Sequence, residues 1–560
     1  GTIGFLVTVN GEPLPQWMIP AASKPGNRVE LHLRNRGYRA GEVLRAAVSA
    51  TDGAGNRGPA AELEFAASNE ALPPLGGAVL PELRGGAGLP KIGQAELAII
   101  DALDKVHPVS GVLIPPQNPE YLATNHLWSS AERRIRLQGA KNEFVAFQIL
   151  LNGPISNLRP ALEFEPQGKG ALEVQWLRCR YVPTPAGPMP DPLVPLRGGF
   201  SIPSADDRIP AQTRGALICE VYIPHESLSG THSGKLSLRA GSDRLELPVS
   251  LEGWDFTLPD SLSFLPEMNC YDLPANERGY YRLAHRHRTV LNRVPYFQNG
   301  RVADGCAPKW SNGKIDWAAW DKRFGGYFDG SAFADLPRRG VPIECFYLPL
   351  EESWPQPIDS FYTGDYWADR AFRPGYREAF VSASRQIAEH LHQHRWGDTL
   401  FQVFLNGKSD FKRNGWSRGS SPWLLDEPAN FQDYWALRYF GEAFHEGVRQ
   451  TSGPAKLLFR CDISRPEWQR NALDHVLDYN VVGGGAFQQY GRLVLDRRAQ
   501  FGQIVVSYGG SNDLPQSNVQ PAAWCVDAWL NGADGVLPWQ TVGNEASWKQ
   551  GDPLALFYPG

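Results

Sequence analysis

The chain has 560 residues, which is too long for one ordinary domain, so we expect two to four domains. Hydrophobic residues make up 42% of it and charged residues 21%, a balance typical of globular proteins rather than of disordered chains. The net charge of −5 argues against nucleic acid as a partner, and no apolar stretch reaches the roughly 18 residues of a membrane span.

The first 67 residues carry strand and turn signals. Within them, "LRAAVSATDGAGNRGPAAELEFAAS" places short apolar runs around the turn cluster "DGAGNRG". This string resembles the last strands of immunoglobulin-like or fibronectin type III-like modules. The segment is short for a complete sandwich, so a partial module is an alternative interpretation. Residues 68–91 are rich in Pro and Gly, which predicts a linker.

Residues 92–258 are predicted to form a β-sandwich. In "DRLELPVSLEGW" apolar residues alternate with polar ones, which is the period of a strand with one buried face. "WLRCRYV" alternates in the same way. Pro248 lies inside the first of these runs and predicts an edge strand, because proline cannot donate to a sheet ladder. Several such strands in one segment favour a sandwich.

Residues 259–560 follow a different pattern, in which apolar runs alternate with helical stretches. In "REAFVSASRQIAEHLHQH" apolar side chains recur every three or four residues, as on one face of a helix. The strand candidates are "LSFLPEMNCY", "TVLNRVPY", "VPIECFYLPL", "TLFQVFLNG", "AKLLFRCDIS", "YNVVGGGA", "QIVVSYGGS" and "GADGVLPWQT". Eight such units in roughly 300 residues predict a (β/α)8 TIM barrel.

The functional site of such a barrel lies at the carboxyl ends of its strands. Polar and aromatic residues gather there: Glu351 and Glu352 after the third predicted strand, Asn406 and Lys408 after the fourth, Asp462 after the fifth, Tyr508 at the seventh, Trp539 and Gln540 at the eighth, and Trp354 and Trp423 in adjoining loops. Sugar hydroxyls need polar partners and sugar faces pack on aromatic walls, so these side chains predict a carbohydrate site.

Asp426 and Glu427 are adjacent in "WLLDEPANFQDYW" and support two interpretations. Adjacent carboxylates can serve substrate-assisted glycoside hydrolysis, in which one protonates the leaving oxygen and the other orients the substrate's 2-acetamido group. An anionic neighbour would then raise the pKa of the acid. Alternatively, Asp426 or Asn430 caps the following helix, with Asp433 three residues beyond Asn430.

Several segments together resemble glycoside hydrolase family 123, whose members join a β-sandwich to a TIM barrel and carry an adjacent Asp-Glu in a "DEP" motif. The matching segments are "GAKNEFVAFQILL", "EVYIPHESLSGTHSGKLSL", "LEGWDFTLP", "GADGVLPWQT" and "GDPLALFYPG", and the likeness covers about 120–560. The resemblance implies hydrolysis of β-linked N-acetylhexosamine (GalNAc-type) glycans by a substrate-assisted retaining mechanism. It further implies Asp426 as the orienting residue, Glu427 as the general acid, and no metal or organic cofactor.

One feature departs from the family pattern, in which the motif follows the fourth strand almost at once. Here the 17-residue loop "SDFKRNGWSRGSSPWLL" intervenes. Either the loop (409–425) returns the Asp-Glu pair to the barrel mouth, or Asn406 takes its place and the pair becomes a helix cap. Two other functions stay open: a glycosidase for a non-acetamido sugar that uses Glu351 or Glu352, and a non-catalytic glycan-binding protein on a degenerate barrel. We expect a polysaccharide or oligosaccharide substrate and a secreted, periplasmic or cell-surface protein.

Overall fold

The computed structural model describes residues 2–14, 19, 31, 38, 41–52, 56–68, 88–166, 168, 170–408, 415–417, 421–510 and 513–560. The chain divides into two compact units. One contains the barrel, Leu262–Gly509 with Trp524–Gln540, and the N-terminal sheet; the other contains the sandwich, Pro73–Ser261, together with Gly510–Ala523 and Thr541–Gly560. The predicted domain boundaries after residues 67, 91 and 258 remain predictions.

The N-terminal region contains one four-stranded antiparallel sheet among its described residues. Its order is β2-β1-β3-β4, with β1 (Thr2–Val9), β2 (Glu12–Pro13), β3 (Val43–Asp52) and β4 (Ala61–Ala66). Val7, Val9 and Leu44 are buried on one face, as the alternation of strand side chains requires.

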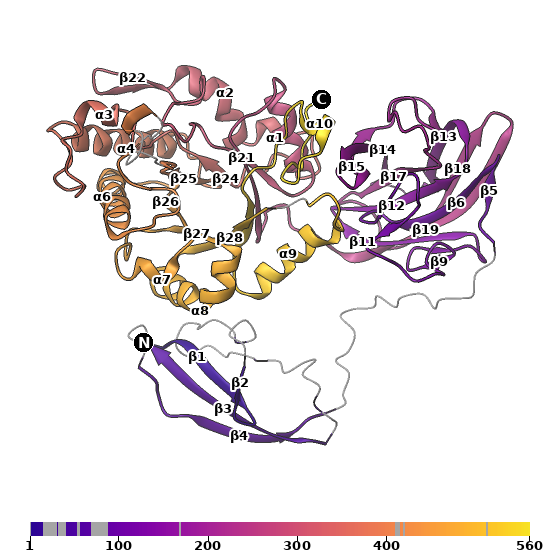
Figure 1. Ribbon diagram of the computed structural model, residues 1–560, viewed down its shortest axis with the longest axis horizontal. Helices are drawn as coiled ribbons and strands as arrows, with labels where there is room; N and C mark the ends of the chain where they lie inside the picture. Colours follow the sequence, from indigo (N-terminus) through magenta and orange to yellow (C-terminus); the bar gives the residue numbers. More distant parts are fainter. Residues whose placement is uncertain are drawn as a thin grey trace. The chain divides into compact units, whose positions relative to one another are not determined.

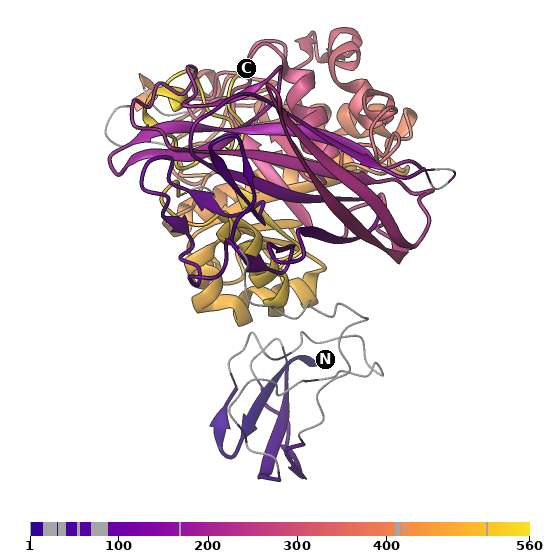
Figure 2. The ribbon, with the colours of Figure 1, turned by 90° about the vertical axis from the view of Figure 1, so that its right-hand side faces the viewer.

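The second region is a sandwich of two sheets, drawn in purple and magenta in Figure 1 and seen across the front of Figure 2. One sheet has the order β16-β13-β18-β19-β11-β10-β9 and the other β15-β14-β17-β12-β6-β5. The bounds are β5 (Lys91–Ile92), β6 (Ala95–Asp101), β9 (Thr124–Asn125), β10 (Trp128–Ser129), β11 (Arg134–Lys141), β12 (Glu143–Asn152), β13 (Ile155–Phe164), β14 (Glu173–Thr184), β15 (Gly187–Pro195), β16 (Phe200–Ile202), β17 (Arg214–Ile223), β18 (Gly230–Ala240) and β19 (Asp243–Thr257). A small hairpin, β7 (Lys105–Val106) and β8 (Leu113–Ile114), lies outside both sheets. Residues from both sheets share one apolar core, so the predicted sandwich is confirmed.

The prediction that Pro248 marks an edge strand is wrong, because β19 lies between β18 and β11. The register explains how the sheet accommodates the proline. On one side Pro248 faces Lys235 of β18, but on the other side the parallel pairing with β11 begins only at Val249, opposite Ile135. At Pro248 the strand is therefore locally unpaired on one side, so that side of the ladder does not require its missing N–H.

The third region is the barrel, whose eight parallel strands have the order β21-β20-β29-β28-β27-β26-β25-β24. They are β20 (Leu265–Cys270), β21 (Val290–Arg293), β24 (Cys345–Tyr347), β25 (Leu400–Phe404), β26 (Lys456–Ile463), β27 (Tyr479–Gly483), β28 (Ile504–Gly509) and β29 (Gly535–Pro538). All eight coincide with the predicted apolar runs. The fold is thus a (β/α)8 TIM barrel, as expected.

Helices and short elements connect these strands (Figure 1). They are α1 (Glu277–Arg286), β22 (Lys309–Ser311), β23 (Lys314–Asp316), α2 (Ala318–Phe328), η3 (Ser331–Phe333), α3 (Ile358–Phe361), α4 (Tyr376–Gln393), η4 (Gly415–Ser417), α6 (Phe431–Val448), α7 (Pro466–Gln469), α8 (Gly484–Phe501), α9 (Val519–Leu530) and α10 (Ser547–Gln550). The predicted amphipathic helix is α4, whose apolar stripe Phe380, Ile387 and Leu391 is buried.

A side-chain hydrogen bond bridges the seam of the barrel. The first and last strands of the sheet order, β21 and β24, are joined by a side chain: the backbone N–H of Tyr347 donates to Oδ1 of Asn292 at 3.0 Å. All seven cysteines are free thiols. In the described part of the chain, no helix combines the length and apolar character that crossing a membrane requires.

Candidate active site

The loop after β25 brings Asp426 and Glu427 back to the carboxyl end of that strand. The backbone N–H groups of Leu425 and Asp426 both donate to the carbonyl oxygen of Gly407, at 2.9 and 3.4 Å. The N–H of Glu427 donates to the carbonyl of Asp462 at 3.1 Å, at the end of β26. Of the two predicted courses of the loop, the structure has the one that returns the pair to the barrel mouth.

The helix cap is made by other residues. Oδ1 of Asn430 accepts the N–H of Asp433 at 3.1 Å, and Oδ2 of Asp433 accepts the N–H of Asn430 at 3.0 Å, which forms a capping box at the start of α6. Of the two predicted cap residues, Asn430 is confirmed as the N-cap of α6 and Asp426 is not the cap. The side chains of Asp426 and Glu427 remain available to the barrel mouth.

Glu427 is the more accessible member of the pair, with a side chain 28% exposed. Its Oε1 accepts hydrogen bonds from Tyr508 and from Oγ of Ser464, the latter at 2.6 Å, and Nζ of Lys408 lies 3.0 Å from Oε2. Its φ of +58° falls in the left-handed region, which is uncommon for a residue with a side chain. Strained backbone of this kind clusters at functional sites, where surrounding contacts maintain it.

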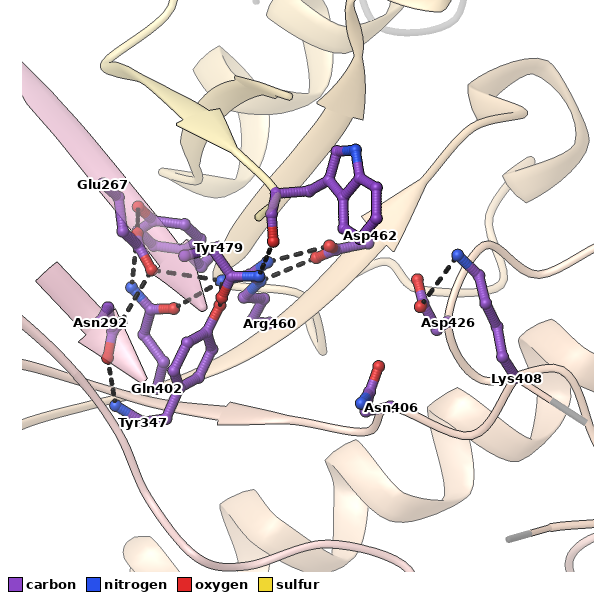
Figure 3. Close-up of polar contacts among 12 residues, drawn as sticks. Glu267, Asn292, Tyr347, Gln402, Asn406, Lys408, Asp426, Arg460, Asp462 and Tyr479 are labelled. Atoms are coloured by element: carbon purple, nitrogen blue, oxygen red, sulfur yellow. Dashed lines mark hydrogen bonds and ion pairs between the residues drawn. The ribbon is translucent and has the colours of Figure 1, made fainter. Parts of the chain in front are cut away.

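Asp426 is the buried member, with a side chain 7% exposed. The ammonium group of Lys408 lies 3.3 Å from its Oδ2, an ion pair that Figure 3 shows. The same lysine also pairs with Glu427, so it bridges both carboxylates. Asn406, two residues beyond β25, lies near Asp426 in this view. It accepts a hydrogen bond from the Tyr271 hydroxyl at 3.3 Å, while its own Nδ2 is buried and has no hydrogen-bond partner among the described residues.

The pKa values of the pair differ from the sequence-based expectation, which placed the raised pKa on Glu427. Burial raises the pKa of Asp426 to about 7, the nearby Asp462 adds to the rise, and Lys408 opposes it. Burial also disfavours the charged form of Glu427, but hydrogen bonds from Ser464, Tyr508 and Lys408 outweigh it and lower its pKa. When the pair carries one proton, these shifts favour Asp426 over Glu427 as its site.

A polar network fills the barrel beneath the pair (Figure 3). Arg460, fully buried on β26, binds both carboxylate oxygens of Asp462 at 2.7 and 2.9 Å and lies 3.3 Å from Glu267. Glu267 accepts further hydrogen bonds from Asn292 at 2.8 Å and from Tyr479 at 2.6 Å. A buried charge is tolerated only when it is paired and hydrogen-bonded, and this network meets that condition for one cation and two acids.

The other predicted site residues fall into two groups. Glu351 and Glu352 are 0% and 1% exposed, and Trp354 and Trp423 are also buried, so none of the four presents a surface at the barrel mouth. Asn406 and Asp462 are buried as well, but Figure 3 places them near Asp426. Tyr508 contacts Glu427, whereas Trp539 is exposed (43%) and Gln540 is half-buried after β29.

Three residues that contact or support the pair were missed from the sequence: Ser464, Tyr271 and Arg460. Ser464 and Tyr271 each directly follow a barrel strand, β26 and β20, whereas Arg460 lies within β26. Ser464 is two residues beyond Asp462, and Arg460 is two residues before it, so strand alternation places Arg460 and Asp462 on the same face. That alternation was the signal that could have identified Arg460.

Comparison with known proteins gives structural similarities only. No family model and no curated protein matches the chain. A family 123 glycoside hydrolase from Clostridium perfringens, described for glycolipid glycan hydrolysis, is 11% identical with a TM-score of 0.49, over 82% of this chain and 80% of that one. A Bacteroides uniformis β-glucuronidase is 9% identical with a TM-score of 0.31, over 75% of this chain but only 47% of its own length. A putative α-galactosidase from Bacteroides fragilis is 10% identical with a TM-score of 0.18, over 62% and 55%. At these identities the likeness concerns the fold alone.

Proposed function

We propose that this protein is a glycoside hydrolase that cleaves β-linked N-acetylhexosamine, of the GalNAc type, by a substrate-assisted retaining mechanism. The observation that carries the proposal is the Asp426–Glu427 pair, which lies at the carboxyl ends of β25 and β26. Glu427 is partly exposed, and neither side chain is used as a helix cap. The family resemblance of the sequence motifs supports the same function. We further propose that the protein acts outside the cytoplasm, where polymeric glycans are found.

In the proposed reaction, the substrate's own acetamido oxygen attacks the anomeric carbon while the bond to the leaving oxygen breaks. Glu427 donates its proton to that leaving oxygen, and Asp426 accepts a hydrogen bond from the acetamido N–H as positive charge develops on the resulting oxazolinium ring. Water then attacks the anomeric carbon and gives a proton back to Glu427, while the bond from that carbon to the acetamido oxygen breaks and the acetamido group is restored. Two inversions at the anomeric carbon produce net retention.

This reaction requires one proton on the pair, and the electrostatics of the site supply one. In the free protein the raised pKa of Asp426 favours this carboxyl as the site of the proton, because it is buried beside Asp462. An acetamido N–H that donates to Asp426 favours the carboxylate form, and a leaving-group oxygen that accepts from Glu427 favours the acid form. Substrate binding therefore moves the proton from Asp426 to Glu427 without changing the charge of the pair.

Asn406 offers a further contact for the sugar. Its Nδ2 is a buried donor with no hydrogen-bond partner among the described residues, and it belongs to the residue that Figure 3 places beside Asp426. Buried polar groups are nearly always hydrogen-bonded, so an open donor at a site implies an acceptor on the ligand. A sugar hydroxyl or carbonyl oxygen supplies such an acceptor.

The two other functions receive less support from the side chains. A glycosidase based on Glu351 and Glu352 needs a carboxyl within reach of the substrate, but both are buried. A glycan-binding protein needs exposed aromatic faces, whereas Trp354 and Trp423 are buried and Trp539 alone of the three predicted tryptophans is exposed.

The test uses aryl β-N-acetylgalactosaminides and β-N-acetylglucosaminides, with the N-acetyl group replaced by N-trifluoroacetyl or by a hydroxyl as matched controls. If the acetamido oxygen is the nucleophile, kcat/KM falls steeply with fluorination, and the hydroxyl analogue is not cleaved. Asp426→Asn should also lower kcat/KM, because a neutral amide stabilises the oxazolinium less. Rates that do not change with the 2-substituent would rule out substrate assistance. If neither sugar is cleaved but the protein binds on a glycan array, the result would favour a binding protein.

A further inference from the structure

A second cluster of chemically active side chains lies away from the barrel mouth. His390 and His394 are four residues apart at the end of α4, so their imidazoles project from the same face of the helix. Asp321, in the first turn of α2, reaches both rings: its Oδ1 lies 2.8 Å from Nε2 of His390 and its Oδ2 lies 3.9 Å from Nε2 of His394. All three ligand atoms lie within 4.8 Å of one another.

The surroundings of the cluster fix both rings in orientation. Trp317 stacks on His390, with ring centroids 4.1 Å apart and planes 6° apart, and Trp396 stacks on His394 at 4.4 Å and 19°. The His390 side chain is buried, while that of His394 is 45% exposed. The cluster is thus held rigidly on one side and open to solvent on the other, which gives an ion a route of entry.

The donor set matches one class of ion. Two imidazole nitrogens and one carboxylate oxygen are ligands that Zn²⁺ prefers, with a water completing a tetrahedron. Zn²⁺ bond lengths of about 2.0–2.2 Å place tetrahedral ligand atoms about 3.3 Å apart. The separations of 2.8 and 3.9 Å run from the two different carboxylate oxygens of Asp321 to the two rings, and one ligand atom from each residue lies within 4.8 Å of the others. An ion therefore requires side-chain rotations that bring these three atoms closer together.

We propose that Asp321, His390 and His394 form a zinc site that links α2 to α4. Such an ion joins two helices that are distant in sequence and stabilises the folded state in proportion to its occupancy. The site has no contact with Asp426 or Glu427 in the structure and is independent of the proposed reaction, for which no metal is expected. The alternative is that the hydrogen bond between Asp321 and His390 ties the helices together without any ion.

The experiment uses the tag-free full-length chain, stripped with a chelator and dialysed. Equilibrium dialysis with Zn²⁺ should give one ion per chain, and the Tm should rise with Zn²⁺ and then level off. Co²⁺ in place of Zn²⁺ should produce the visible absorption of four-coordinate cobalt. A stoichiometry well below one, or a Tm that Zn²⁺ does not raise, would overturn the proposal in favour of the simple hydrogen bond.

Variants assign the site. His394→Ala should weaken Zn²⁺ binding by about tenfold or more, because it removes one of three protein ligands, and Asp321→Asn should also weaken it. The matched control is His392→Ala, on the same helix, whose ring accepts the N–H of Ala455 and lies outside the cluster. Each Tm shift is measured against the same variant without metal, which separates loss of binding from loss of folding. Equal affinities for His394→Ala and His392→Ala would place the ion elsewhere and refute the assignment.

Discussion

Two pairs of adjacent carboxyl groups follow neighbouring strands of the barrel, and they differ in their access to solvent. Glu351 and Glu352 follow β24 and are fully buried, whereas Glu427 in the loop after β25 is 28% exposed and shares Lys408 with Asp426. In each pair one carboxyl has a raised pKa: burial and Glu352 raise that of Glu351, and burial and Asp462 raise that of Asp426.

The two pairs share a raised pKa but differ in their access to solvent, and the sequence alone does not distinguish these two properties. A raised pKa follows from burial beside another acid, and both pairs have it. Only the second pair adds an accessible partner, Glu427, whose carboxylate is stabilised by hydrogen bonds from Ser464 and Tyr508. A reacting pair needs both a protonated group and a group that reaches the substrate, so exposure rather than acidity distinguishes a candidate active site from a buried acid pair.

The largest difference between the pairs should be in activity. Glu427→Gln removes the proposed acid and should lower kcat/KM by about 10²–10⁴-fold on aryl glycosides with poor leaving groups, and far less on dinitrophenyl glycosides. Glu351→Gln, made in parallel, should leave kcat/KM nearly unchanged, because Glu351 is fully buried and out of reach of a substrate. The reverse result would transfer the chemistry to the buried pair.

The next largest effect concerns the buried network that supports Asp426 and Glu427. Arg460→Met leaves Asp462 and Glu267 as uncompensated buried acids and should lower the free energy of unfolding of the barrel by about 3–5 kcal/mol. Urea denaturation followed by tryptophan fluorescence measures the loss. Arg377→Met, which breaks a surface ion pair with Glu446, is the control and should cost at most about 1 kcal/mol. Equal losses would mean that the buried network contributes little.

A smaller effect concerns the pH dependence of stability. Because the pKa of Asp426 rises to about 7 on folding, the folded state binds a proton between pH 4 and 7 that the unfolded state lacks, so stability falls as pH rises through this range. Asp426→Asn removes that dependence and should stabilise the protein at pH 8, by about 1–3 kcal/mol, but not at pH 4. Denaturation midpoints across pH measure it, and parallel curves for variant and wild type would contradict the raised pKa.

The smallest effects are expected from removing the tyrosine hydroxyl groups that donate hydrogen bonds to the two pairs. Tyr508→Phe removes a hydrogen bond to the Glu427 carboxylate, and it should raise the pKa of Glu427 and lower kcat/KM by about tenfold. Tyr376→Phe removes a hydrogen bond to the backbone oxygen of Glu352, and it should cost about 1 kcal/mol of stability without changing kcat/KM. Both pH–rate profiles should be recorded, since a shift in the second would connect the buried pair to the reaction.

The barrel could be predicted from the sequence because its strands are buried on both faces. Runs such as "YNVV" and "QIVVSY" are nearly continuous in apolar residues, and this property is local. The neighbours of each strand are not a local property. Pro248 is the example. The residue alone predicts an edge strand, but the sheet order places its strand in the interior. The sheet accommodates the proline there because the pairing with β11 starts one residue later.

The candidate site could be predicted in part. The residues at the strand ends were predicted. The return of the loop to Gly407 was not, because it depends on two backbone hydrogen bonds between residues that are 18 and 19 positions apart in the sequence. The location of the proton was predicted incorrectly, since adjacency alone puts a raised pKa on either acid. Burial and the donors Ser464 and Tyr508 decide between Asp426 and Glu427, and neither is visible in the sequence.

The double hydrogen bond to the carbonyl of Gly407 has a consequence for how this barrel can diversify. The chain leaves β25 and returns to the same carbonyl oxygen, so the two ends of the intervening loop are held together whatever its length. Loops closed at their base change length at little entropic cost. Insertions, deletions or grafted sequences between Lys408 and Trp423 should therefore leave the positions of the two carboxylates nearly unchanged. The length of this stretch of the gene is in that sense uncoupled from the placement of Asp426 and Glu427.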